Sequence, residues 1–154
     1  MKLPARRQGG FVPDILHDFP IKAPPARVFA EVSLPLGLDQ WWTLHSAGAP
    51  RLGNEYELDF GPGYLWRARV TRAEPDREFE LELTAAEPQW IGTRVGFHLT
   101  AVAGGTQVRF YHVGWPGESE NFRVSSYCWA MYLRILRRHL EHGEAVPYER
   151  RLEA

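Results

Sequence analysis

The segment from Ile21 to Phe60 constrains the fold more than any other part of the chain. The residues that lead into it alternate in polarity, which predicts a half-buried strand whose apolar face carries Ile15, His17, Phe19 and Ile21. Pro24 and Pro25 end that strand and favour the first turn of a helix to about Val32. A second short helix over residues 36–42 and a strand opened by Gly53 follow. This order is typical of a sheet that wraps around a helix.

Short alternating runs fill the middle of the chain. They predict strands over residues 54–60, 66–70, 78–83, 90–100 and 107–112. Glycine and proline mark the turns between them, at residues 61–63, 74–76 and 104–105. Strands of similar length joined by short turns predict an antiparallel meander.

The last predicted element is a long helix. Its apolar residues recur at helical spacing, namely Phe122, Trp129, Leu133, Leu136 and Leu140. Gly143 suits a helix C-cap, and Pro147 prevents continuation. We therefore expect an α+β fold, in which a curved antiparallel sheet of about six to seven strands grips this helix. We expect one domain over residues 11–146, a flexible arm over residues 1–10 and a flexible tail over residues 147–154.

Composition narrows the classes of partner and site. The 18 basic and 19 acidic residues give a net charge of −1, which does not favour nucleic-acid binding. One cysteine allows neither an internal disulfide nor a thiolate metal cluster, and we expect no metal and no cofactor. Residues 1–10 do not resemble a signal peptide, and no apolar run is long enough to span a bilayer. We therefore expect a cytoplasmic protein without membrane insertion.

The order of motifs resembles the SRPBCC superfamily, whose fold is called START-like or helix-grip. Within it, the chain is most similar to homologues of the C-terminal domain of the activator of the heat-shock chaperone ATPase. The matching motifs are I-K-A-P-P-A-R-V-F at 21–29, L-D-Q-W-W at 38–42, T-R-V-G-F-H-L-T at 93–100, G-G-T-Q-V-R-F-Y-H-V-G-W at 104–115 and the helix at 127–143. The resemblance implies a cavity between the sheet and the last helix. It also implies binding of a small hydrophobic or amphipathic molecule.

Several residues are candidates for the wall of such a cavity. Strand alternation places His17, Trp66 and His112 on the concave face. Trp42, Trp90 and Trp115 stand near the ends of elements, where we expect a cavity mouth, and Tyr127 and Met131 stand on the last helix. A histidine on an apolar face most often hydrogen-bonds a neighbour. Alternatively it orients a ligand, and we expect His112 to do so from a partly hydrated rim.

Two other functions remain open. A cyclase- or hydrolase-type enzyme needs converging polar groups, for which the candidates are His17, Tyr64, His112 and Tyr127. A chaperone-associated interaction module needs an exposed patch, and the row Glu78, Glu80 and Glu82 is the candidate. A homodimer is also compatible with the sequence.

Overall fold

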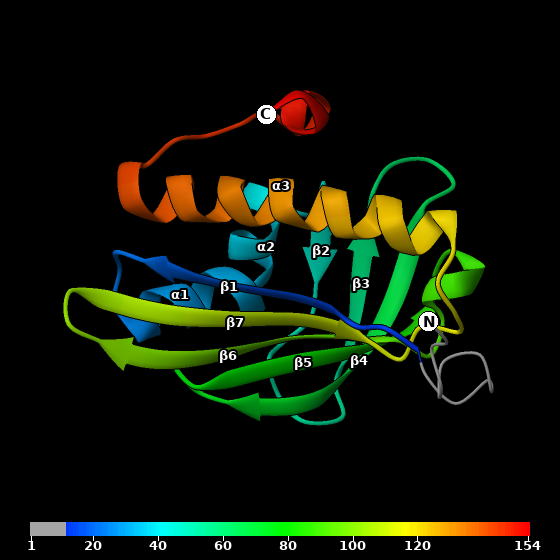
Figure 1. Ribbon diagram of the computed structural model, residues 1–154, viewed down its shortest axis with the longest axis horizontal. Coiled ribbons are helices and arrows are strands. Elements are labelled where there is room, and N and C mark those ends of the chain that lie inside the picture. Colours follow the sequence, from blue (N-terminus) through cyan, green and yellow to red (C-terminus); the bar gives the residue numbers. More distant parts are fainter. Residues whose placement is uncertain (1–11) are drawn as a thin grey trace, which may run out of the picture.

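The elements follow the expected order along residues 12–154, which the computed structural model describes (Figure 1). The arm expected over residues 1–10 lies outside the described residues. The strands are β1 (Ile15–Ile21), β2 (His45–Ala47), β3 (Glu55–Asp59), β4 (Leu65–Glu74), β5 (Glu78–Ala85), β6 (Arg94–Val102) and β7 (Gly105–Val113). The helices are α1 (Pro25–Ser33), α2 (Pro35–Trp41) and α3 (Glu120–His142), with 3-10 turns η2 (Pro88–Trp90) and η3 (Tyr148–Glu153).

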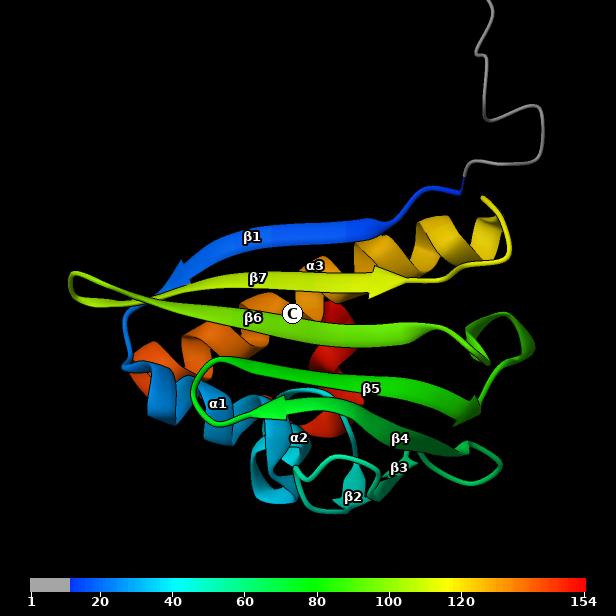
Figure 2. The ribbon, with the colours of Figure 1, turned by 90° about the horizontal axis from the view of Figure 1, so that it is seen from below.

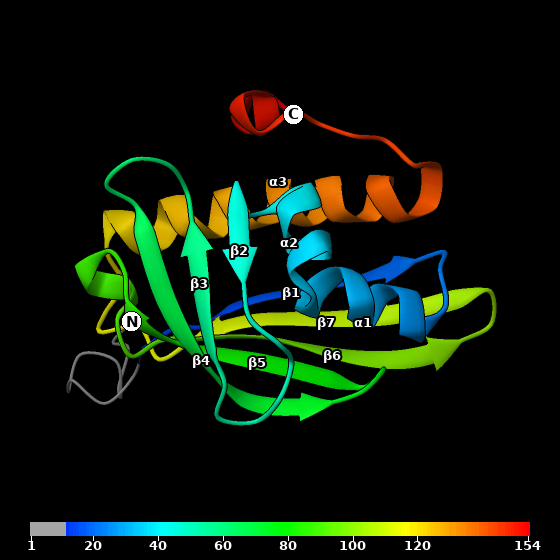
Figure 3. The same cartoon turned by 180° about the vertical axis from the view of Figure 1, so that it is seen from behind.

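All seven strands belong to one antiparallel sheet, in the order β1-β7-β6-β5-β4-β3-β2. Figure 2 shows them side by side in this order, with α3 across the concave face. The register between β4 and β5 shifts after Arg67 and again after Val70. Such irregularities bend a strand and increase its twist. The start of β4, together with β3 and β2, accordingly curls toward α3 (Figure 3).

Helix α3 is held in the concavity by the predicted apolar stripe. Trp129, Leu133, Leu136 and Leu140 are all buried, which confirms the expected phase of the helix for its core face. The Ser119 side chain caps the first turn by accepting from the Phe122 amide, and Gly143 ends the helix at φ 69°. The α+β architecture of a curved sheet gripping a C-terminal helix is therefore confirmed.

Two elements differ from the sequence-based expectation. Strand β2 was not predicted, because three residues are too few to show alternation. The strand expected over residues 90–100 begins only at Arg94, since Pro88–Trp90 forms a 3-10 turn and Gly92 adopts φ 85°. The Ile91 side chain is consequently exposed and does not continue the strand face.

The C-terminal residues also differ from the flexible tail expected over residues 147–154. Tyr148–Glu153 forms η3, and Arg151 within it is buried. Its guanidinium donates to the backbone oxygens of Asp39 (2.7 Å), Thr43 (3.1 Å) and Val146 (3.2 Å). The tail is therefore anchored beside α2 through Arg151, a residue of the segment that the sequence predicted to be flexible.

Candidate functional site

A cavity of about 270 Å³ opens between the first half of α3 and the curled end of the sheet. Its lining is mainly aromatic and comes from α2, the β3–β4 and β5–β6 connections, β4 and α3. The lining residues are Trp42, Phe60, Tyr64, Trp66, Glu87, Trp90, Asn121, Val124, Ser125, Cys128, Trp129 and Tyr132. An apolar concavity with a few polar groups is the usual form of a small-molecule site.

Five of these rings contact one another in a closed circuit. Centroid distances are 5.4 Å from Trp42 to Phe60, 4.9 Å from Phe60 to Trp66 and 5.0 Å from Trp66 to Trp90. The circuit closes through Trp129, at 5.9 Å from Trp90 and 5.1 Å from Trp42. Tilted and edge contacts dominate, which is the favoured arrangement of aromatic pairs. These rings form the inner wall of the cavity.

A polar edge lies on the α3 side of the cavity. The Trp90 indole Nε1 donates to Asn121 Oδ1 and Ser125 Oγ, at 3.3 Å each. Ser125 Oγ also donates to Asn121 Oδ1 at 3.3 Å. Ser119 Oγ donates to Gln89 Oε1 at 2.7 Å, which ties the start of α3 to η2. The polar edge is therefore fixed to the aromatic wall at the cavity mouth.

The charge of the lining at neutral pH rests on one residue. Burial raises the pKa of the Cys128 thiol above its ordinary value. Burial, with smaller effects from Tyr148 and Cys128, raises the pKa of Tyr132 to about 12, although Arg151 opposes the increase. Both groups are therefore protonated and neutral. Glu87, whose Oε2 accepts from the Gln89 amide at 3.0 Å, is the only acidic or basic residue of the lining that is charged.

The structure places three of the eight expected wall residues in this lining and five elsewhere. Trp42, Trp66 and Trp90 line the cavity, and their part in binding stays a prediction. Trp115 is buried behind Trp90 and donates from Nε1 to the His112 backbone oxygen at 3.2 Å. Tyr127 and Met131 lie on another side of α3, beside Leu152. The residues one position later, Cys128 and Tyr132, face the cavity instead.

His112 does not occupy the partly hydrated rim that we expected. Its side chain is fully buried, and burial lowers its pKa to about 3. Nε2 lies 2.8 Å from Thr93 Oγ1, and Nδ1 lies 3.0 Å from the Trp129 indole nitrogen. Both ring nitrogens are therefore occupied by protein partners. The alternation of β7 correctly predicted that the His112 ring lies on the concave face of the sheet. Trp115 and Trp129 pack against the ring there, so it is shielded from solvent.

His17 lies in a separate groove between β1 and α3. The groove has a volume of about 180 Å³ and includes Phe19, Leu133 and Arg134 in its lining. The imidazole stacks on Phe110 at 6.1 Å, and its Nε2 is buried without a hydrogen-bond partner in residues 12–154.

The four candidates for acid–base chemistry do not converge. Tyr64 lies at the cavity, His112 in the core, His17 in the β1–α3 groove and Tyr127 on the exposed side of α3. General acid–base chemistry requires groups within hydrogen-bond reach of one reacting centre. These four residues therefore do not form such a set.

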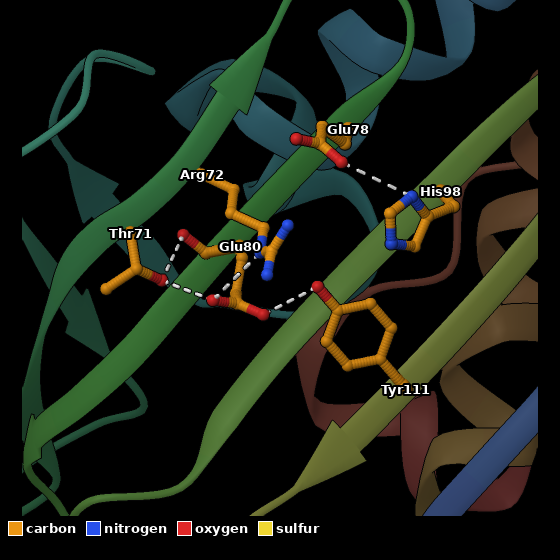
Figure 4. Close-up of polar contacts among 6 residues, drawn as sticks. All are labelled: Thr71, Arg72, Glu78, Glu80, His98 and Tyr111. Carbon is orange, nitrogen blue, oxygen red and sulfur yellow. Dashed lines mark hydrogen bonds and ion pairs between the residues drawn. The ribbon is translucent and has the colours of Figure 1, made fainter.

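The acidic row on the outer face of β5 is not the fully exposed patch that an interaction module would need. Glu80 is only 5% exposed. Its carboxylate accepts hydrogen bonds from Tyr111 Oη and Thr71 Oγ1, both at 2.6 Å, and lies 3.7 Å from Arg72 Nε (Figure 4). The neighbouring Glu78 lies 3.4 Å from His98 Nδ1. This row is therefore largely engaged within the sheet.

Several lining residues were missed by sequence reasoning. On α3 they are Asn121, Val124, Ser125, Cys128 and Tyr132. Their spacing of three and four residues is the signal that identifies one helix face. Phe60 was missed because the sequence placed it on the face of the strand expected over residues 54–60, whereas β3 ends at Asp59 and Phe60 lies at the turn into Gly61.

Within residues 12–154, no three His, Cys, Asp or Glu side chains gather as a metal site requires. No helix in the described part of the chain is long and apolar enough to cross a membrane.

Solved structures with the same fold are numerous. The Aha1 dimer from Colwellia psychrerythraea aligns with a TM-score of 0.79 and 28% identity, over 87% of this chain and 100% of the other. MLL2253 from Mesorhizobium loti aligns with a TM-score of 0.75 and 18% identity, over 86% of this chain and 99% of the other. DynU16, described as a protein in the dynemicin biosynthetic locus, aligns with a TM-score of 0.71 and 24% identity. The alignment covers 86% of this chain and 48% of the other. These likenesses support the SRPBCC helix-grip fold.

No curated protein matches the sequence significantly. A protein-family model does match, over residues 22–141, which span the structure from the end of β1 almost to the end of α3. The matched family is described as Activator of Hsp90 ATPase homolog 1-like protein. Since the match covers most of the chain and agrees with the fold, this protein belongs to the Activator of Hsp90 ATPase homolog 1-like family.

Proposed function

We propose that this protein binds a small hydrophobic or amphipathic molecule in the cavity between α3 and the curled end of the sheet. The observation that carries the proposal is the aromatic circuit of Trp42, Phe60, Trp66, Trp90 and Trp129 along one wall of that cavity. Rigid aromatic walls offer a large apolar contact area, and burial of apolar area contributes about 25 cal/mol per Å². The polar edge of Asn121 and Ser125 supplies groups that orient a ligand.

The single cysteine offers a direct test. Cys128 lines the cavity, so a molecule bound there covers its thiol. Octanol is a suitable apolar probe. We expect octanol to bind in isothermal titration calorimetry and to slow alkylation of Cys128 by N-ethylmaleimide, followed by mass spectrometry.

A matched pair of variants locates the binding. Val124 lines the cavity and is 54% exposed, so Val124→Trp fills the opening without disturbing the core. Val102 is 46% exposed at the end of β6 and does not line the cavity, so Val102→Trp is the control. Octanol binding and thiol protection should be lost in the first variant and retained in the second. Equal behaviour of the two variants, or no protection of Cys128 in the wild type, contradicts the proposal.

A homodimer remains a second expectation. It is supported by the Colwellia relative, whose structure is described as a dimer. Sedimentation equilibrium of the full chain measures the assembly directly, and a single monomer mass at all concentrations contradicts it.

A further inference from the structure

We infer that the cavity selects ligands whose apolar body carries a positive charge, as in an alkylammonium ion. The inference rests on the proposed function, because it concerns the same cavity, and it adds the charge of the ligand. Two independent observations support it: the geometry of the aromatic circuit and the charges of the lining residues.

The cavity wall is built from contacting aromatic rings. Neighbouring centroids lie 4.9 to 5.9 Å apart, and each of the five rings contacts two others of the circuit. A cation that lies over the face of such a ring is attracted to it within roughly 6 Å of the ring centre. Four of the five rings are tryptophans, which attract cations most strongly among aromatic side chains. Rings so arranged favour a positive group.

The charges of the lining point the same way. Glu87 is the one carboxylate among the lining residues, and no lysine, arginine or histidine lines the cavity. Cys128 and Tyr132 stay neutral because burial raises the pKa of each. A carboxylate or phosphate ligand would therefore meet the negative faces of the rings and the Glu87 carboxylate without a compensating cation. An ammonium group meets attraction from both.

The buried arginine Arg151 is engaged outside the cavity. Arg151 influences Tyr132 electrostatically, but its guanidinium donates to three backbone oxygens behind the wall. It also lies 5.3 Å from the centre of the Tyr148 ring. It does not line the cavity, so it is not available to pair with an anionic ligand there.

Three probes with the same alkyl chain isolate the effect of charge. Octyltrimethylammonium, octanol and octanoate, each below its micelle concentration, are titrated calorimetrically into the full chain at about 0.15 M salt, where exposed charges are largely screened. We expect octyltrimethylammonium to bind about tenfold more tightly than octanol, as a desolvated cation–π contact implies. Octanoate should bind more weakly than octanol.

The role of Glu87 is tested with a matched pair of variants. Glu87→Gln keeps the shape of the side chain and removes the charge, so it should lower the ratio of the octyltrimethylammonium affinity to the octanol affinity about threefold or more. Glu153, an exposed residue of η3, does not line the cavity, and Glu153→Gln should leave the ratio unchanged.

The outcomes separate the inference from the proposed function. If octanol binds and protects Cys128 but the three probes have equal affinities, or octanoate binds most tightly, the inference is overturned and the proposed function stands. The inference is also overturned if Glu87→Gln and Glu153→Gln lower the ratio of the octyltrimethylammonium affinity to the octanol affinity equally. Such a result would show that the net charge of the protein, and not Glu87 at the cavity, causes the preference. If no probe binds and Cys128 stays unprotected, the proposed function fails and the inference fails with it.

Discussion

The Trp129 indole Nε1 donates a hydrogen bond of 3.0 Å to Nδ1 of His112. Because an indole nitrogen only donates, Nδ1 is the acceptor, and the proton of the neutral imidazole lies on Nε2. Nε2 then donates to Thr93 Oγ1 at 2.8 Å, and the Thr93 hydroxyl donates to the Trp90 backbone oxygen at 2.5 Å. This chain joins two members of the aromatic circuit, Trp129 and Trp90. His112 is therefore a positioning residue for the cavity wall.

The first prediction concerns acid stability. Burial lowers the pKa of His112 from its ordinary 6.5 to about 3, so the folded protein holds the ring neutral where the unfolded chain protonates it. The resulting stability is complete above pH 6.5 and is lost as the pH falls from there toward 3. In this window the free energy of unfolding should fall by about 1.4 kcal/mol per pH unit from this residue. Urea unfolding at a series of pH values measures the slope.

The control is His112→Gln, whose amide offers a donor and an acceptor but does not titrate. Its stability at pH 7 should be lower than that of the wild type, and the part of the slope due to His112 should vanish. An identical slope in both proteins assigns the acid sensitivity to other groups, such as the pair His139 and Glu31, whose Nε2 and Oε2 lie 3.0 Å apart.

The second prediction concerns the outer face of the sheet, where Gly96 lies between Glu80 and Tyr111 in the register of β5, β6 and β7. A Cβ atom at Gly96 would lie 2.3 Å from both Cζ and Oη of Tyr111. Gly96→Ala must therefore displace the ring and break its 2.6 Å hydrogen bond to Glu80. We expect a loss of about 1–3 kcal/mol in the free energy of unfolding, since a buried charged acceptor loses a donor.

A double-mutant cycle with Tyr111→Leu tests this cause. Once the ring is removed, the alanine at position 96 should cost much less than it does alone, so the two changes should be strongly non-additive. Additive effects would show that the alanine acts on the strand itself and not through Tyr111.

The third prediction concerns α3. Trp129 is 1% exposed and contacts Trp42, Trp90 and Phe110. Trp129→Ala should lower the free energy of unfolding by about 3–5 kcal/mol, the usual effect of truncating a buried tryptophan. Tyr127, two residues earlier and 79% exposed, provides the control, because Tyr127→Ala should stay within about 0.5 kcal/mol of the wild type. Thermal and urea unfolding compare the two; similar losses would mean that the phase of the helix is wrong.

The fourth prediction concerns the anchored tail. Arg151→Met keeps much of the side-chain volume but leaves the backbone oxygens of Asp39, Thr43 and Val146 without this donor. We expect a loss of about 1–3 kcal/mol and faster hydrogen exchange over residues 148–153. Arg150 is exposed, so Arg150→Met should change neither quantity. Unchanged exchange in the Arg151 variant would show that η3 is held by other contacts, such as the 2.9 Å hydrogen bond from Tyr148 Oη to the Phe60 oxygen.

The fold could be predicted wherever a periodic pattern was long. The apolar stripe of α3 and the alternation of β1, β5 and β7 are repeated several times along each element, so single exceptions do not obscure them. Strand β2 has three residues and carries no such pattern. The anchoring of η3 depends on Arg151 reaching backbone oxygens more than 100 residues away in sequence, as with Thr43 and Asp39. Local sequence carries no signal for such contacts.

The site was predictable only in part, because a cavity is formed by side chains that converge from distant elements. Trp42, Trp66 and Trp90 were identified from strand alternation and element ends. On α3 the core face was predicted correctly, but the cavity-facing residues were expected one position too early, at Tyr127 and Met131 in place of Cys128 and Tyr132. A step of one residue turns a helix by about 100°. The burial of His112 could not be foreseen, because it depends on Trp115 and Trp129 closing over the end of β7.

The arrangement of the indole rings also determines how this protein absorbs and emits light. All six tryptophans belong to one network of ring contacts, through the pairs 41–42, 42–129, 90–129, 66–90 and 90–115. Chromophores this close exchange excitation energy before they emit, so the ultraviolet fluorescence is a collective signal and not the sum of six independent ones. Because four of the six rings line the cavity, a single intrinsic emission spectrum reports on its interior.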